Sequence, residues 1–159
     1  MMLQLRFAPR FSAAIRAGQK VQTFRLGAPR AEPGSPIQLI ESGSGRLLLN
    51  SWILAVQPAV ITRAVCWDGK PQIGGLRLGG RWLDLAEHDA FAALSGFGAD
   101  EPGCASASEA MARFFATIYP GTELCPEGAA LHGHVTVWAG VNDEATVLRR
   151  LIQPAELVA

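Results

Sequence analysis

Glycine and proline divide this chain into short segments, and this feature constrains the fold more than any other. The 159 residues include 17 glycines and 10 prolines. Both residue types favour turns and rarely occupy the interior of long helices. The pattern argues against a helical bundle and indicates many short elements joined by turns.

The segments between these turns predict a mixed α+β fold. Alternating apolar residues predict strands at 3–7, 20–25, 37–41, 47–56, 59–67, 76–83 and 131–138. Helical spacing and capping residues predict helices at 9–17, 84–94, 106–118 and 144–152. Gln57 and Pro58 are expected to separate the two central strands, and Gly74-Gly75 is expected to be a turn. Six or seven mostly consecutive strands with three or four helices indicate a small, largely antiparallel β-barrel.

Size and composition fit one ordinary soluble domain. A chain of 159 residues, 49% of them apolar, can bury roughly 70% of its unfolded surface. Three cysteines are too few, and odd in number, for a disulfide framework. No apolar run approaches the ~20 residues of a membrane helix, and arginines interrupt any secretory signal. We therefore expect a cytoplasmic protein that does not enter membranes.

The charge is balanced in total but not along the chain. The 14 basic and 14 acidic residues cancel, which argues against a protein that coats polyanions. Residues 1–31 nevertheless carry six basic residues and no acidic ones. These six are Arg6, Arg10, Arg16, Lys20, Arg25 and Arg30. Such asymmetry predicts a site for an anionic ligand, with Arg10, Lys20, Arg25 and Arg30 near one another.

The segment from Gly18 to Arg25 combines several of these charges in a short pattern. On a regular strand Thr23 and Arg25 share one face, whereas Lys20 has the opposite parity. Lys20 and Thr23 can converge only if Lys20 lies in the turn after Gly18 or at a bulge. A simple interpretation is that Lys20 and Arg25 hold a phosphate or a base edge while Thr23 donates a hydrogen bond.

The same segment resembles the signature of the ASCH domain, a member of the PUA-like superfamily. The signature G-x-K-x-x-T-x-R matches residues 18–25. Pro33-Gly34 before the strand at 37–40, Ser95-Gly96-Phe97, and the run 118–121 before the strand at 135–138 also fit the family. The resemblance spans about residues 1–140, so 141–159 are interpreted as a helical extension. Val147, Leu148, Leu151 and Ile152 have helical spacing there, and predict a helix that docks on the barrel or on a second subunit.

The resemblance implies a β-barrel whose cleft, beside the first helix, binds RNA or a nucleotide. One branch of the family is an amidohydrolase that removes the acetyl group from N4-acetylcytidine, using a lysine, a threonine and a glutamate. The lysine and threonine correspond to Lys20 and Thr23, whereas Ser95 stands at the glutamate position. The possible substitutes for that carboxylate are Glu87, Asp89, Asp100 and Glu101. RNA or nucleotide binding is the main expectation, the amidohydrolase is the alternative, and a protein-interaction module is a third.

The predicted site combines these residues with a few others. As catalytic residues of the alternative reaction we expect Lys20 and Thr23. As ligand-binding residues we expect Arg10, Lys20, Thr23, Arg25, Arg30, Ser95 and Tyr119. Lys20 could act as a base only if burial or a nearby cation lowered its pKa well below ~10.4.

A few aromatic residues and histidines elsewhere in the chain are further candidates for ligand or metal binding. Tyr119, Phe97 and Trp138 are candidates for stacking on a base, although Phe97 and Trp138 are better explained as core residues. His132 and His134 alternate on one strand and could bind zinc together with Cys104 or Cys125. No C-x-x-C or H-x-x-x-H spacing accompanies them, so no metal and no other cofactor is predicted.

Overall fold

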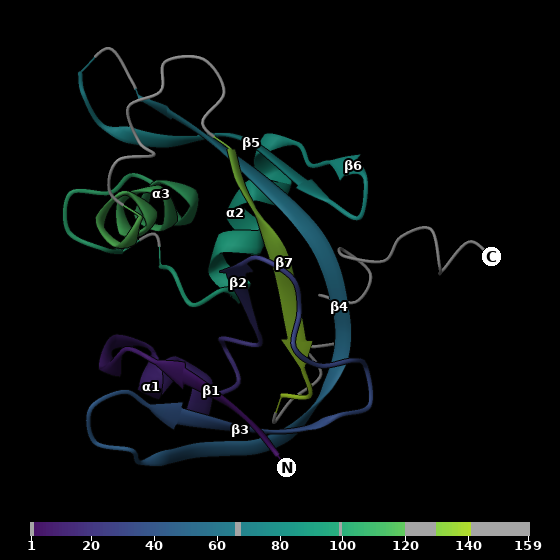
Figure 1. Ribbon diagram of the computed structural model, residues 1–159. Coiled ribbons are helices and arrows are strands. Elements are labelled where there is room, and N and C mark those ends of the chain that lie inside the picture. Colours follow the sequence, from purple (N-terminus) through teal and green to yellow (C-terminus); the bar gives the residue numbers. More distant parts are fainter. Residues whose placement is uncertain (1, 66–67, 99, 120–129, 141–159) are drawn as a thin grey trace.

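The computed structural model describes residues 2–65, 68–98, 100–119 and 130–140 (Figure 1). Its strands are β1 (Leu3–Phe7), β2 (Gln22–Leu26), β3 (Pro36–Glu41), β4 (Leu47–Val65), β5 (Pro71–Leu78), β6 (Arg81–Trp82) and β7 (Ala130–Trp138). Its helices are the 3-10 turn η1 (Pro9–Phe11), α1 (Ser12–Arg16), α2 (Leu85–Leu94) and α3 (Ala107–Ile118). The predicted helix at 144–152 lies outside the described residues.

The strands form one mixed sheet of seven, which confirms the mixed α+β class. The pairing order is β1-β3-β4-β5-β6, and β7 pairs with both β4 and β2. The β1–β3 pair is parallel, and every other pair is antiparallel. No pairing joins the edge strands β1, β2 and β6 to one another within the described residues, so the expected closed barrel is not formed by strand pairing.

The central strand is longer than predicted. β4 continues through Gln57 and Pro58 as one curved strand, where two strands were predicted (Figure 1). The carbonyl of Pro58 accepts a hydrogen bond from the Gly79 amide, which directs the polar groups of Pro58 toward the β5 side. The ladder with β5 starts only at Ala59, so the missing N–H of proline has no ladder partner to lose. β4 thus serves both halves of the sheet.

A second prediction about turns is also wrong. Gly74-Gly75 lies inside β5 and is not a turn. The register between β4 and β5 shifts between Thr62 and Arg63, opposite these glycines. A Cβ atom at Gly75 would lie 2.9 Å from both the Thr62 hydroxyl and the Trp82 ring. The glycines therefore allow an irregular and crowded strand pair rather than a chain reversal.

The helices cover the concave side of the sheet and enclose the core. α2 and α3 pack on each other, α3 also contacts β5, and α1 lies near the β1 and β3 end of the sheet (Figure 1). Asp84 caps α2 and Ser106 caps α3, each accepting a hydrogen bond from a backbone amide three residues on. No helix in the described part of the chain is long and apolar enough to cross a membrane.

Candidate functional site

A small cavity lies where β1, η1, β2 and the ends of α2 and α3 meet. We call it the inner cavity, and its volume is about 170 Å³. Five of the predicted ligand-binding residues line it together, namely Lys20, Thr23, Arg25, Ser95 and Tyr119. Its remaining wall is mostly aromatic, formed by Phe7, Phe11, Phe24, Phe97, Phe114 and Phe115 together with Arg6, Ala8 and Ile118.

The turn between α1 and β2 places Lys20 in this cavity. Gly18 takes a left-handed conformation with φ of 75°, which ends the helix as the sequence predicted. The backbone amides of Gln19 and Lys20 both donate to the Ala14 carbonyl, at 2.9 and 3.1 Å. Because β2 begins only at Gln22, Lys20 lies outside the alternation of the strand. The turn thereby brings Lys20 and Thr23 to one cavity despite their opposite parity.

The Lys20 amine is buried among carbonyls and aromatic rings. The side chain is 3% exposed. Nζ donates to the carbonyl oxygens of Gln22 at 2.9 Å and Ser95 at 2.5 Å. It also lies 4.6 Å from the centre of the Phe11 ring and 5.3 Å from that of Phe7. Both carbonyls can be satisfied by a neutral amine as well as by a charged one, because each form has at least two N–H donors.

These surroundings lower the pKa of Lys20 from its ordinary 10.5 to about 7. Burial is the largest cause, and the positive charges of Arg25 and Arg10 add to it. No carboxylate is hydrogen-bonded to Nζ in the described part of the chain. Near neutral pH the amine is therefore partly charged and partly neutral. A lysine can act as a base only when its neutral form is present, and this requirement is met here.

Gln22 and Ser95 form a buried support that the sequence analysis missed. The Gln22 amide nitrogen donates to the Phe91 carbonyl and to Ser95 Oγ, both at 2.8 Å. Ser95 Oγ in turn donates to the Phe91 carbonyl at 2.9 Å. The serine hydroxyl is thus used to fix the end of α2, and Ser95 reaches Lys20 through its backbone carbonyl. The only sign of this support in the sequence is a glutamine, Gln22, within a segment predicted to be a strand.

Gly96 allows the end of α2 to approach Lys20 closely. Its φ is +94°, a conformation that residues with a side chain rarely adopt. A Cβ atom there would lie 2.8 Å from Lys20 Cδ and 3.0 Å from the Phe11 ring. Glycine at this position therefore serves both the backbone turn and the packing of the lysine stem.

Arg25 connects the inner cavity to a larger neighbouring one. Nη2 of Arg25 donates to the Arg6 carbonyl at 2.7 Å, and the guanidinium lies over the Phe7 ring at 5.3 Å. No other nitrogen of Arg25 has a hydrogen-bond partner among the described residues. The neighbouring cavity, which we call the outer cavity, measures about 330 Å³ and shares Arg25 and Tyr119 with the inner one. Arg30 lines the outer cavity but not the inner one.

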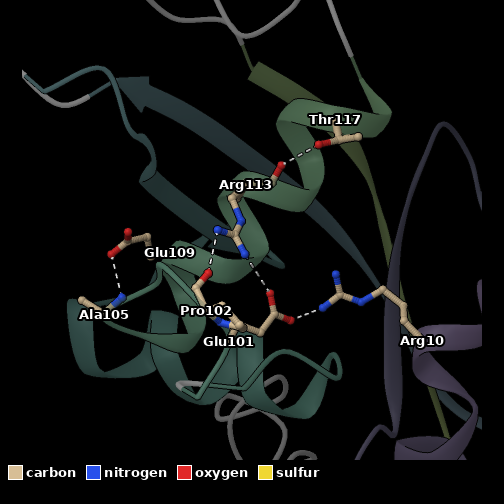
Figure 2. A network of polar contacts seen from close by, with 7 residues as sticks. All are labelled: Arg10, Glu101, Pro102, Ala105, Glu109, Arg113 and Thr117. Atoms are coloured by element: carbon tan, nitrogen blue, oxygen red, sulfur yellow. Dashed lines mark hydrogen bonds and ion pairs between the residues drawn. The ribbon is translucent and has the colours of Figure 1, made fainter.

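Arg10 has a different role from the one predicted. It does not line the inner cavity but forms an ion pair with Glu101, which also pairs with Arg113 of α3 (Figure 2). Its guanidinium lies 5.0 to 5.4 Å from the ring centres of Phe11, Phe97 and Phe114. Arg10 therefore ties η1 to the loop after α2, and the expected cluster of four cations is divided.

None of the four carboxylates named as possible substitutes takes the glutamate position that Ser95 occupies. Glu101 is held by two arginines, and Glu87 pairs with Arg81 at 2.8 Å. Asp89 accepts a hydrogen bond from the Ser108 amide, and Asp100 lies in the loop after α2. None of the four lines the inner cavity.

The remaining candidates also separate. Phe97 and Trp138 are buried core residues, as expected. His132 is exposed, whereas His134 is buried and its Nδ1 lies 2.8 Å from the Gly27 carbonyl. The described residues contain no group of three or more potential metal ligands, and Cys125 lies outside them.

Comparisons with protein-family models, curated proteins and solved structures found no match to this chain.

Proposed function

We propose that this chain is an RNA- or nucleotide-binding domain of the ASCH type, with a PUA-like arrangement of strands in a sheet that does not close. The observation that carries the proposal is the meeting of Lys20, Thr23 and Arg25 in one aromatic-walled cavity, with no carboxylate among the described residues that line it. Aromatic walls suit the face of a base, and cations with a hydroxyl suit its polar edge or a phosphate.

The size of the inner cavity limits what it can hold. Its 170 Å³ lies below the roughly 300–1,000 Å³ of sites for drug-sized ligands. One base or a group of similar size is the appropriate occupant, with the rest of the ligand outside. The cavity therefore suits recognition of one nucleotide at a time and not of a folded duplex.

Titration calorimetry with nucleosides, nucleotides and short single-stranded RNAs tests this proposal. Thr23→Val removes one hydroxyl at nearly constant shape, so affinity should fall about fivefold, the equivalent of one neutral hydrogen bond. Arg46→Gln is the control, because Arg46 is exposed and pairs with Glu41 in the loop between β3 and β4. Absence of binding to every ligand, or equal loss in both variants, would overturn the proposal.

The Lys20 amine supports a second candidate, the amidohydrolase. A partly neutral amine shares the cavity with the Thr23 hydroxyl. In that reaction Thr23 Oγ1 attacks the acyl carbon while Lys20 accepts the hydroxyl proton. The proton then leaves with the amine of the cytosine, and water releases the acid from Thr23. Because none of the described lining residues is a carboxylate, they do not supply this acid–base assistance, which is worth roughly 10²–10⁴ in rate, so turnover should be slow.

Release of acetate from N4-acetylcytidine measures this second candidate. We expect slow or undetectable release by the natural chain, and a higher rate for Ser95→Glu if that carboxylate restores the assistance. Lys20→Ala should abolish any activity. Rapid release that survives Lys20→Ala would show that these residues do not carry the reaction.

A further inference from the structure

Polar residues of β2 and β7 lie opposite one another in the sheet, and together they line both the inner and the outer cavity. Thr23 is directly opposite Thr136, and Arg25 is directly opposite His134. Opposite residues of antiparallel strands have Cβ atoms about 4.5–5.5 Å apart on the same face. Thr23 and Arg25 line the inner cavity, while Arg25, His134 and Thr136 line the outer cavity. The two cavities therefore share one continuous polar surface.

Among the described residues, the lining of the outer cavity is positively charged and contains no acidic side chain. Arg25 and Arg30 both line it, and none of its lining residues is Asp or Glu. Burial lowers the pKa of Arg25, Tyr119 opposes this shift, and the charge of Arg30 adds to it. Two guanidinium groups thus act on the same space, and guanidinium groups favour phosphate over neutral ligands.

His134 adds a proton-sharing group to this cavity. The Gly27 carbonyl can only accept, so Nδ1 of His134 carries the hydrogen in their 2.8 Å contact. Nε2 is left without a hydrogen-bond partner among the described residues. A phosphate monoester has a second pKa of about 6, so its protonated oxygen can donate a hydrogen bond to Nε2, whereas the phosphodiester of an RNA strand has no such proton to donate. The Tyr119 and Thr136 side chains complete the polar lining.

We propose that the outer cavity is a phosphate subsite, so that the ligand of this protein is a phosphorylated nucleoside unit rather than a free nucleoside. The inference rests on the proposed function, because it takes the base to lie in the inner cavity. Arg25, common to both cavities, then contacts the junction between base-bearing sugar and phosphate. The phosphate belongs either to a mononucleotide or to an RNA strand.

Calorimetry with the four ribonucleosides, their 5′-monophosphates and a short single-stranded RNA tests the subsite. The preferred monophosphate or the RNA should bind roughly 10- to 100-fold more tightly than the matching nucleoside, as expected for charge-assisted hydrogen bonds. A gain already seen with monophosphates assigns the subsite to a mononucleotide, and a gain seen only with RNA assigns it to a strand. Equal affinities for all three ligands overturn the inference.

Two variants separate the subsite from the inner cavity. Arg30→Gln removes one cation, and His134→Asn keeps a donor toward Gly27 while removing Nε2. Both should reduce the phosphate gain and leave nucleoside affinity unchanged, whereas Arg46→Gln should alter neither. If both variants keep the full gain in affinity from the phosphate, the phosphate subsite is overturned, but binding of the base in the inner cavity is not. Failure of the natural chain to bind nucleosides, nucleotides and RNA alike overturns the proposed function itself.

Discussion

At the scale of single residues, the main feature is a buried lysine that has no acidic partner in the described part of the chain. Nζ of Lys20 is held by two backbone carbonyls and lies beside aromatic rings, and burial lowers its pKa to about 7. Removing an ammonium group from water is costly unless another charge compensates for it. In the proposed function, a carbonyl oxygen at the edge of a bound base would accept a hydrogen bond from this amine and stabilise its charged form.

The lowered pKa predicts a pH-dependent stability. Between about pH 7 and 10.5 the unfolded chain binds a proton that the folded amine has lost, so the free energy of unfolding rises with pH. Below about pH 7 both states are protonated, and the folded state carries the full cost of the buried charge. Lys20→Met should remove this rise, which is at most ~1.4 kcal/mol per pH unit.

Denaturant unfolding of both proteins between pH 6 and 10 measures the effect. The stability of Lys20→Met relative to the natural chain should decline as pH rises through this interval. Other groups that titrate in the same range cancel in the difference. A difference that does not change with pH would contradict the lowered pKa of Lys20.

The sequence carried enough information to predict part of the site but not its support. The Gly18 turn and the parity of residues 20–25 predicted how Lys20 and Thr23 meet, because those relations are local. The hydrogen bond from Gln22 to Ser95 joins residues 73 positions apart, and no local pattern encodes it. The pairing of Arg10 with Glu101 depends on a contact across 91 positions and was missed for the same reason.

At the scale of elements, the end of α2 depends on glycine. Gly96→Ala should destabilise the protein more than Gly43→Ala, because both have positive φ but only Gly96 faces close neighbours. We expect about 1–2 kcal/mol for Gly43→Ala from the left-handed backbone. Gly96→Ala should cost roughly 1–3 kcal/mol more through contact with Lys20 and Phe11. Thermal and denaturant unfolding measure the stability of both variants. Equal losses of stability would show that the Lys20 side chain moves aside without an energetic cost.

β4 gives a second prediction at this scale. The alternation of buried residues continues on both sides of Pro58, but the sequence hid this period because both sides are continuous apolar runs and proline suggested a break. The Pro58 carbonyl faces β5, so the amide of Ala59 faces β7. Pro58→Ala should therefore change stability little, whereas Ala59→Pro should cost at least about 1–3 kcal/mol through a lost ladder bond. Similar unfolding midpoints for the two variants would contradict this orientation of β4.

At the scale of the whole molecule, the basic N-terminal segment does not form one continuous surface. Lys20 and Arg25 enter the inner cavity, Arg25 and Arg30 the outer one, and Arg10 is paired with Glu101. The complete chain has no net charge. Long-range attraction of a polyanion is therefore weak, and any preference for phosphate must come from these few local cations.

This arrangement predicts a shallow salt dependence of RNA binding. Each phosphate neutralised on a single strand contributes roughly −0.7 to the slope of log affinity against log salt concentration. With one phosphate in the outer cavity, we expect a slope of about −0.7. Arg30→Gln should make the slope shallower by as much as ~0.7, while Arg46→Gln should leave it unchanged.

Fluorescence anisotropy with a labelled short RNA over a range of salt concentrations measures these slopes. A slope several times steeper would indicate that the RNA follows an extended basic surface, and a slope of zero would indicate a neutral ligand held by stacking. Either result would contradict the assignment of one phosphate to Arg25 and Arg30.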